Sequence, residues 1–134
     1  MSCCLLRALV YLHQNKVIHA DVKLENCLFG NDQADSLHLV DFGLSINIRD
    51  SSENLEGVRG TLNYMAPELL LASSEKQIIT QISDRTDVWA AGVVIFTLSC
   101  GYLPFNGSSQ KDIIQQMTAP EAQIHRRLTS SPKW

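Results

Sequence analysis

The strongest constraint on the fold is a run of 18 residues without a charged side chain, VWAAGVVIFTLSCGYLPF, from Val88 to Phe105. Its length reaches the lower limit for an α-helix that spans a lipid bilayer. Gly92, Gly101 and Pro104 interrupt the run, however, and no flanking Lys or Arg cluster would fix an orientation across a membrane. An apolar helix can also lie at the centre of a globular domain. We therefore expect a helix from about Asp87 that is buried on all sides, with a membrane span as the alternative.

Composition agrees with one globular intracellular domain. The chain has 134 residues, 45% of them hydrophobic, which is enough for a core. The net charge of −3 comes from scattered residues, so the sequence predicts neither a nucleic-acid partner nor an anionic membrane surface. The four cysteines form no CxxC pair, which favours reduced thiols over a disulfide framework or a zinc site. The N-terminus does not read as a signal peptide, and we expect the protein in the cytoplasm or the nucleus.

Shorter patterns predict the other elements. Leu5, Leu9 and Leu12 recur at helical spacing and predict a helix that ends between His13 and Lys16. The runs CLFG and LHLVDFG, separated by the turn-like GNDQADS, predict two strands and a hairpin, with Asp41 at a strand end.

The second half of the chain is predicted to be mainly helical. A polar stretch at 44–63 reads as a functional loop because loops of this length are uncommon inside compact domains. A leucine-rich helix is expected to start at Ala66-Pro67-Glu68, and an amphipathic helix is expected from Gln110 to Met117. The expected fold class is mainly α with a small β-hairpin.

Polar residues gather in HADVKLEN, at 19–26, and again in DFG, at 41–43. Taken singly, each of these residues could be a solvated charge or a turn residue. Together they offer carboxylates, an ammonium group and an amide oxygen, which are the groups that phosphoryl transfer asks of a protein.

Four motifs follow one another along the chain: HADVKLEN at 19–26, DFG at 41–43, GTLNYMAPE at 60–68 and DVWAAGVVIF at 87–96. In this order and spacing they resemble the C-terminal lobe of eukaryotic protein kinases. The resemblance implies that residues 1–134 are a partial protein kinase domain, whose N-lobe, which makes the intact family α+β, is absent. The stretch GYLPF is similar to the calcium/calmodulin-dependent and AMP-activated groups.

The resemblance implies roles for the polar cluster. Asp21 matches the carboxylate that orients the substrate hydroxyl, and Lys23 matches the cation beside the transferred phosphate. Asn26 and Asp41 match the two Mg²⁺ ligands, so ATP and Mg²⁺ are the implied cofactors. Lys23 and Thr61 follow the serine/threonine pattern, in which the threonine hydroxyl bonds the catalytic Asp and Lys. The implied partners are ATP and a protein with a Ser or Thr hydroxyl; the oligomeric state is left open.

Other matching positions are structural. In the resemblance His19 and Phe42 belong to the hydrophobic spine, Leu28 forms the floor of the adenine pocket, and Asp87 accepts N–H bonds from the catalytic loop. Glu68 pairs in the family with an arginine much further along, which would leave a costly buried carboxylate here. Glu25 stands where some kinases contact a basic substrate residue, although a surface glutamate without a role fits equally well.

Two features depart from the family. Ala20 replaces the arginine that binds a phosphate on the activation loop. The second is that no GxGxxG follows a strand and no VAIK-like lysine precedes His19. Two functions therefore stay open: a segment of an active serine/threonine kinase that is inactive when isolated, or a truncated kinase-like or pseudokinase module that binds partners without catalysis.

Overall fold

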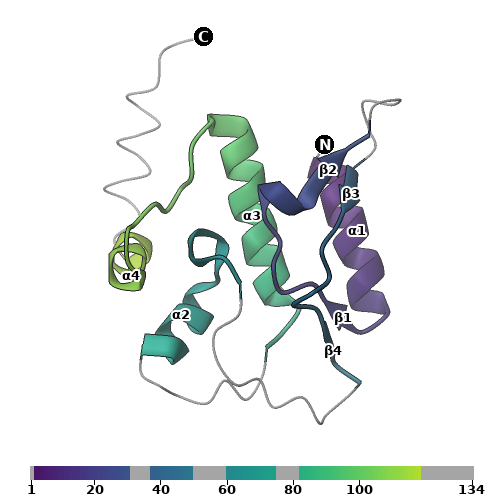
Figure 1. Cartoon of the computed structure of the whole chain (residues 1–134), viewed down its shortest axis with the longest axis horizontal. Coiled ribbons are helices and arrows are strands. Elements are labelled where there is room, and N and C mark those ends of the chain that lie inside the picture. The colour runs from purple at the N-terminus through teal and green to yellow at the C-terminus, as the bar shows by residue number, and fades with distance from the viewer. Residues whose placement is uncertain (1, 31–36, 50–59, 75–81, 119–134) are drawn as a thin grey trace.

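The computed structural model of the chain describes residues 2–30, 37–49, 60–74 and 82–118. It is rich in helix and contains two small antiparallel sheets (Figure 1). In chain order the elements are α1 (Ser2–Gln14), β1 (Val17–Ile18), the 3-10 helix η1 (Leu24–Asn26), β2 (Cys27–Phe29), β3 (Leu37–Leu39), β4 (Ile46–Asn47), the 3-10 helix η2 (Leu62–Tyr64), α2 (Pro67–Ser74), α3 (Arg85–Cys100) and α4 (Gln110–Thr118). The predicted hairpin strands and the helices α1, α2 and α4 are confirmed.

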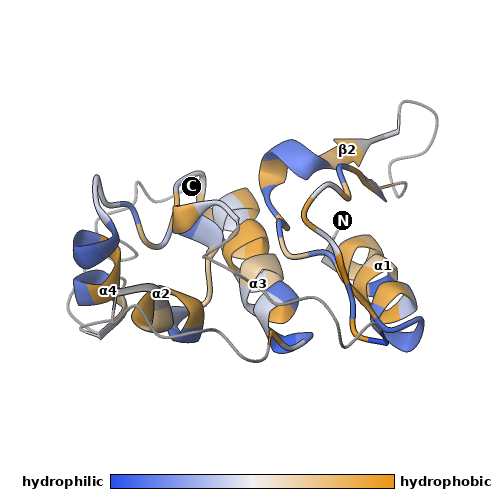
Figure 2. Cartoon of the chain, turned by 60° about the horizontal axis from the view of Figure 1, so that its bottom comes forward, coloured by the Kyte–Doolittle hydropathy of each residue, from blue (hydrophilic) through white to orange (hydrophobic). Residues whose placement is uncertain are grey.

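Helix α3 stands between two buried clusters of side chains. It lies between α1 on one side and the pair α2 and α4 on the other (Figures 1 and 2). Leu5 and Leu9 of α1 share a cluster with Val94 of α3, while Leu70 of α2 and Ile113 of α4 belong to the second. Burying this apolar surface in two clusters is the main force that holds the helices together.

Trp89 of α3 connects the two clusters. Its side chain contacts both, and its ring stacks on Phe105 with centroids 5.8 Å apart. A tryptophan side chain buries a large apolar area, and here that area is shared between the two clusters. Helix α3 therefore packs against both buried clusters.

The prediction that α3 is buried on all sides is wrong. Val88 is 55% exposed and Leu98 is 38% exposed. Val88 lies with Gly92, Phe96 and Phe105 along a groove of about 750 Å³. The described part of the chain places one core on each side of α3 and leaves this third face open.

The uncharged run is also not one helix. Gly101 ends α3 in the left-handed conformation, at φ 77°, and its N–H bonds the carbonyl of Thr97. Glycine adopts this conformation without a steric cost, so it is a common helix terminator. None of the helices in the described ranges is long and apolar enough to cross a membrane.

Two strand pairs place the polar segments side by side. The predicted hairpin pairs β2 with β3 in antiparallel register, with Leu28 opposite His38. An unpredicted pair joins β1 to β4, with Ile18 opposite Ile46. The segment 19–23 runs from β1 to η1 and β2, and the segment 40–45 runs from β3 to β4. Because both ends of each segment are paired with ends of the other, the HADVKLEN and DFG motifs are held next to one another.

The polar stretch at 44–63 is only partly described. Its described ends contain β4 and η2, so it is not irregular throughout. Asp50, Ser51, Ser52 and Arg59 lie outside the described residues.

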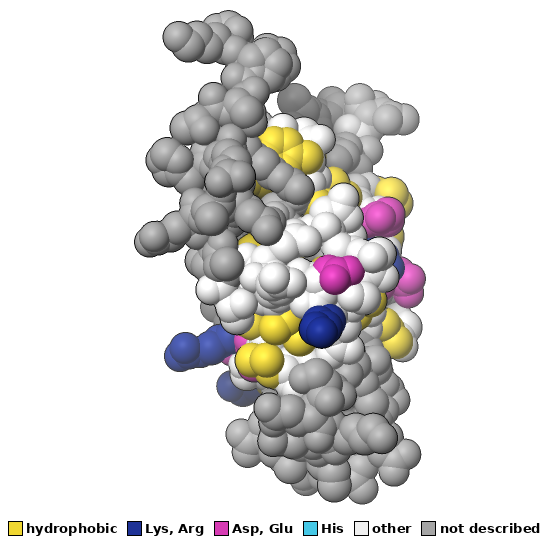
Figure 3. Space-filling view, turned by 90° about the vertical axis from the view of Figure 1, so that its left-hand side faces the viewer, with side chains coloured by type: hydrophobic (Ala, Val, Ile, Leu, Met, Phe, Trp, Pro, Cys, Tyr) yellow, Lys and Arg dark blue, Asp and Glu magenta, His cyan; other side chains and the backbone are white. Residues whose placement is uncertain are grey.

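On the face drawn in Figure 3, the described acidic and basic side chains are interspersed, and the apolar ones form separate small groups.

Candidate active site

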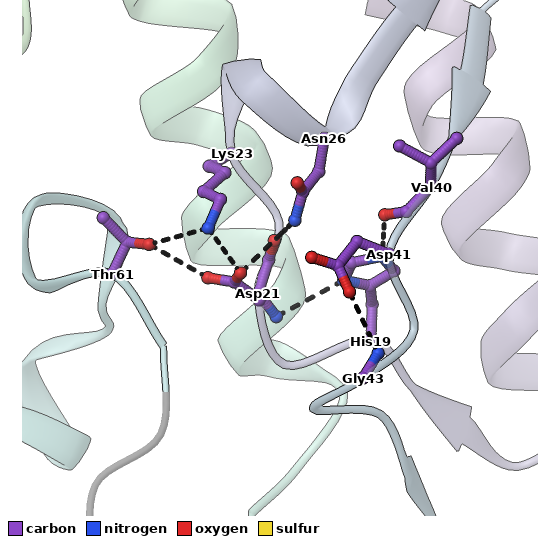
Figure 4. A network of polar contacts seen from close by, with 8 residues as sticks. All are labelled: His19, Asp21, Lys23, Asn26, Val40, Asp41, Gly43 and Thr61. Atoms are coloured by element: carbon purple, nitrogen blue, oxygen red, sulfur yellow. Dashed lines mark hydrogen bonds and ion pairs between the residues drawn. The ribbon is translucent and has the colours of Figure 1, made fainter.

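Asp21, Lys23 and Thr61 form a triangle of polar contacts (Figure 4). The Lys23 ammonium lies 2.6 Å from Asp21 Oδ2 and 3.2 Å from Thr61 Oγ1. The Thr61 hydroxyl donates to Asp21 Oδ1 at 3.0 Å. The hydrogen bond to Asp21 is the main cause that raises the pKa of Lys23 above its usual 10.5, against a smaller opposing effect of burial. The triangle therefore presents an ammonium group that keeps its charge at neutral pH, beside the carboxyl group of Asp21.

Asn26 supports the carboxylate of Asp21 from the other side. Its Nδ2 donates to the Asp21 carbonyl at 2.8 Å and to Asp21 Oδ2 at 3.3 Å. The single turn of η1 brings Asn26 back over Asp21, and both side chains are buried. Because the nitrogen of the amide is used in this way, its oxygen is the atom suited to hold a cation.

His19 ties the loop to the DFG segment. Its Nε2 lies 3.1 Å from the carbonyl of Val40, and the Asp21 N–H donates to its Nδ1 at 3.3 Å. Nδ1 therefore acts as an acceptor and Nε2 as a donor in these two contacts. The His19 ring also contacts that of Phe42, with centroids 4.9 Å apart and a tilt of 58°.

Asp41 is exposed and sits in a left-handed conformation at φ 64°. Its Oδ1 accepts the N–H of Gly43 at 3.2 Å, and Figure 4 shows its carboxylate on the side of the loop that carries Asn26. A short polar side chain tolerates this backbone region better than most, because it can bond locally. The strand pairs thus bring Asp41 to the polar cluster across 20 residues of sequence.

Asp87, in the first turn of α3, lies beneath the loop and is 1% exposed. It accepts the N–H of His19 on Oδ2 at 2.8 Å and the N–H of Ala20 on Oδ1 at 2.9 Å. Sequence reasoning placed Asp87 here but missed His13, whose Nε2 also contacts Asp87 Oδ2 at 2.8 Å. No signal in the sequence pointed to this contact, because a histidine in the last turn of a helix is common without a distant partner.

A family model for the protein kinase domain matches residues 1–134 of the chain. The chain belongs to the protein kinase family. The match spans the whole sequence, including the four motifs on which the resemblance was based.

Curated relatives agree with this family. A calcium/calmodulin-dependent protein kinase of Metarhizium anisopliae is 34% identical over 124 residues, which are 92% of this chain and 31% of that protein. A calcium/calmodulin-dependent serine/threonine-protein kinase of Malus domestica is 33% identical over 122 residues, which are 90% of this chain and 28% of that protein. The chain therefore spans about a third of the length of these relatives.

A solved structure shows the same fold. A chain in the crystal structure of the yeast RNA Pol II CTD kinase complex superposes with a TM-score of 0.71 and 33% sequence identity. The match covers 84% of this chain and 34% of that chain. The described part of the molecule is therefore a kinase-like fragment, helix-rich as predicted.

The oxygen atoms of this site are of the chemical type that binds Mg²⁺. Mg²⁺ prefers hard oxygen ligands, and Asn26 and Asp41 supply an amide oxygen and a carboxylate. The Asp41 charge also contributes to the raised pKa of Lys23, so the two groups act on one another. Asn26, Asp41 and Lys23 are the residues that would face a Mg²⁺-bound phosphate group.

Two positions differ from what the sequence implied or stay outside the network. Glu68 is exposed, so the expected cost of a buried unpaired carboxylate does not arise; its side chain lies at the edge of the groove beside α3. Leu28 is 53% exposed on β2, and its role at an adenine ring stays a prediction. The polar network does not depend on either residue.

Proposed function

We propose that the protein containing this chain is a serine/threonine kinase, which transfers the γ-phosphate of ATP to a Ser or Thr hydroxyl of a protein substrate. The observation that supports it best is the triangle of Asp21, Lys23 and Thr61. Phosphoryl transfer needs positioning and charge stabilisation more than covalent chemistry from the protein. The triangle holds a carboxylate in one orientation and keeps a cation beside it.

Each side chain has a stated task in this proposal. Asp21 accepts a hydrogen bond from the substrate hydroxyl and takes its proton, while Lys23 stabilises negative charge next to it. Thr61 keeps Asp21 and Lys23 in register. ATP supplies the transferred group, and Asn26 and Asp41 are the residues that would hold its Mg²⁺.

The isolated chain is not proposed to be active. Its sequence contains neither a glycine-rich loop over the phosphates nor the lysine that pairs with them. Its curated relatives are about three times as long, as the shares of 31% and 28% show. Transfer is therefore proposed for a longer protein that includes both parts.

A second candidate is a kinase-like module that binds a partner and transfers nothing. The apolar groove along Val88, Gly92 and Phe96 favours it, because a groove of about 750 Å³ is large enough to hold side chains of another segment. The retained cluster around Asp21 argues for the kinase, since a binding module has no need of it.

The cellular setting stays a proposal as well. We place the protein in the cytoplasm or nucleus because its four cysteines form no CxxC pair and are interpreted as reduced thiols. Glu25, exposed beside the catalytic loop, is proposed to contact a basic residue of the substrate.

Phosphate transfer from γ-labelled ATP to Ser- or Thr-containing peptides tests the proposal. We expect Mg²⁺-dependent transfer by a protein extended upstream to include GxGxxG and a VAIK-like strand, and none after Asp41→Ala. The 134-residue chain alone should transfer no label. Failure of the extended protein to transfer label would favour the binding module, and robust transfer by the short chain would show that the missing loop and lysine are dispensable.

A further inference from the structure

Asn106 lies in the connection between α3 and α4, is exposed, and is followed by Gly107. Both hydrogen-bonding groups of its backbone are held by one side chain. The Asn106 N–H donates to Gln116 Oε1 at 2.9 Å, and Gln116 Nε2 donates to the Asn106 carbonyl at 2.9 Å. Among the described residues, none bonds the Asn106 side chain or the Gly107 N–H. The backbone of Asn106 is therefore fixed while its side-chain amide is free in water.

The other exposed asparagines of the described ranges differ from Asn106 in this respect. Asn15 Nδ2 donates to the Tyr11 carbonyl at 2.8 Å, and Asn47 Oδ1 accepts the Arg49 N–H at 3.1 Å. Each of the two is also followed by a residue that has a side chain. Asn106 combines a free side-chain amide with a following glycine, which has no Cβ to hinder an approach to its nitrogen.

We propose that Asn106 is a site of spontaneous deamidation, at which isoaspartate forms, and that Gln116 slows this reaction. The Gly107 nitrogen attacks Cγ of Asn106, the new N–Cγ bond replaces the Cγ–Nδ2 bond, and the amide group leaves as ammonia with the proton of the Gly107 N–H. Water then opens the resulting succinimide ring at either carbonyl. One opening leaves aspartate, and the other leaves isoaspartate, in which the main chain runs through the former side chain.

The hydrogen bonds from Gln116 oppose closure of the ring. For Gly107 N to reach Cγ, the chain must rotate about the Cα–C bond of Asn106. This rotation turns the Asn106 carbonyl away from Gln116 Nε2, to which it is bonded. The reaction therefore proceeds from the fraction of molecules in which this local pair of bonds is open.

Isoaspartate would disturb the attachment of α4. It lengthens the main chain by one methylene between Phe105 and Gly107. The chain has no room there, because even a Cβ atom on Gly107 would lie 2.7 Å from Asp112 Cβ in the first turn of α4. Phe105 is 8% exposed within the cluster shared by α2 and α4. The longer chain loses either the bonds to Gln116 or the position of Phe105, and the cluster loosens.

Ageing of the extended protein at neutral pH and body temperature tests the site. Mass spectrometry of its peptides, with the aspartate and isoaspartate forms separated, measures each asparagine in one sample. We expect Asn106 to lose its amide at least about tenfold faster than Asn15 or Asn47. Asn106→Gln should remove the signal, because ring closure at glutamine is slow. Equal rates at Asn106 and Asn15 would overturn the proposal.

Two variants of α4 test the restraint by Gln116. Gln116→Leu removes both hydrogen bonds and should speed deamidation of Asn106 about tenfold, with Asn15 unchanged. Gln115→Leu, at an exposed neighbour on the same helix, is the matched control and should keep the wild-type rate. An unchanged rate in Gln116→Leu, or an equal increase at Asn106 and Asn15, would overturn the restraint, since the second result shows a general loss of structure.

Amide hydrogen exchange tests the effect on α4. In aged wild-type protein, exchange should rise about tenfold in the modified fraction of a peptide covering residues 110–118, and stay constant in one covering residues 2–14. Aged Asn106→Gln should show no rise in either peptide. Unchanged exchange at 110–118 in the modified protein would show that isoaspartate leaves α4 in place. None of these measurements depends on the proposed kinase function, because no phosphate transfer is needed.

Discussion

The Thr61 hydroxyl donates a hydrogen bond to Asp21 Oδ1 over 3.0 Å and joins segments that are 40 residues apart in sequence. Thr61 is also the N-cap residue of η2, yet its side chain makes no capping hydrogen bond there. Its hydroxyl is thus committed to Asp21 and Lys23 rather than to the local backbone. This contact couples the GTLNYMAPE segment to the HADVKLEN segment.

We predict that Thr61→Val in the extended kinase lowers kcat about tenfold, because valine keeps the shape but frees Asp21 and Lys23 to reorient. Thr61→Ser should stay near the wild-type rate. Thr97→Val is the matched control, since the Thr97 hydroxyl bonds the Val93 carbonyl within α3, away from the site. Equal kcat values for Thr61→Val and Thr97→Val would show that the contact has no catalytic effect.

A second prediction concerns backbone strain at Ala20. The left-handed conformation costs an alanine roughly 1–2 kcal/mol, whereas glycine adopts it freely but loses about 0.5–1 kcal/mol in chain entropy. We therefore expect Ala20→Gly to raise the free energy of unfolding by about 0.5 kcal/mol. Ala8→Gly, inside α1, should lower it by about 1 kcal/mol. Urea denaturation of each variant measures its free energy of unfolding. Similar losses of this free energy in Ala20→Gly and Ala8→Gly would contradict the strain at Ala20.

A third prediction concerns alkaline pH. Burial, with a smaller effect of the Glu25 charge, raises the pKa of the Cys27 thiol above its usual 9.0. As the pH rises past the unfolded value, the unfolded chain loses this proton before the folded protein does, so stability falls. The difference in unfolding free energy between the wild type and Cys27→Ala should therefore shrink between about pH 8 and pH 10. A constant difference across that range would contradict the shift.

A fourth prediction concerns regulation. A phosphate on an activation loop acts when a basic side chain binds it, and Ala20 cannot. Phosphorylation at Ser51 or Ser52, both outside the described residues, should change the activity of the extended kinase by less than about twofold. A strong activation, lost on Arg59→Ala, would instead assign the phosphate contact to Arg59.

The elements predicted correctly are those with a repeating local signal. Leu5, Leu9 and Leu12 mark α1 by their spacing, and the alternation in LHL marks β3. The pair β1 and β4 was missed because two residues are too few for any period, and because the partners are far apart in sequence. The open face of α3 was missed for a different reason: apolar residues show that a helix can be buried, and not which neighbours cover it.

The site residues also divide into those that local motifs identify and those that only tertiary packing reveals. The motifs brought Asp21, Lys23, Asn26, Asp41 and Thr61 to attention, and the structure places them around one loop. The exposure of Glu68 and the contact between His13 and Asp87 depend on tertiary packing. A single sequence does not carry that information, because the sequence around a histidine is the same whether or not a carboxylate contacts its side chain.

Asp21 is proposed to act on the substrate hydroxyl, and kcat of Asp21→Asn in the extended kinase tests this role most directly. Asparagine fills the same volume but cannot take a proton, so we predict that kcat falls by a factor of about 100 or more. Asp84→Asn, at an exposed N-cap of α3 without a side-chain capping bond, should keep the wild-type value. A kcat for Asp21→Asn within about threefold of the wild type would contradict the assignment of Asp21 as the catalytic carboxylate.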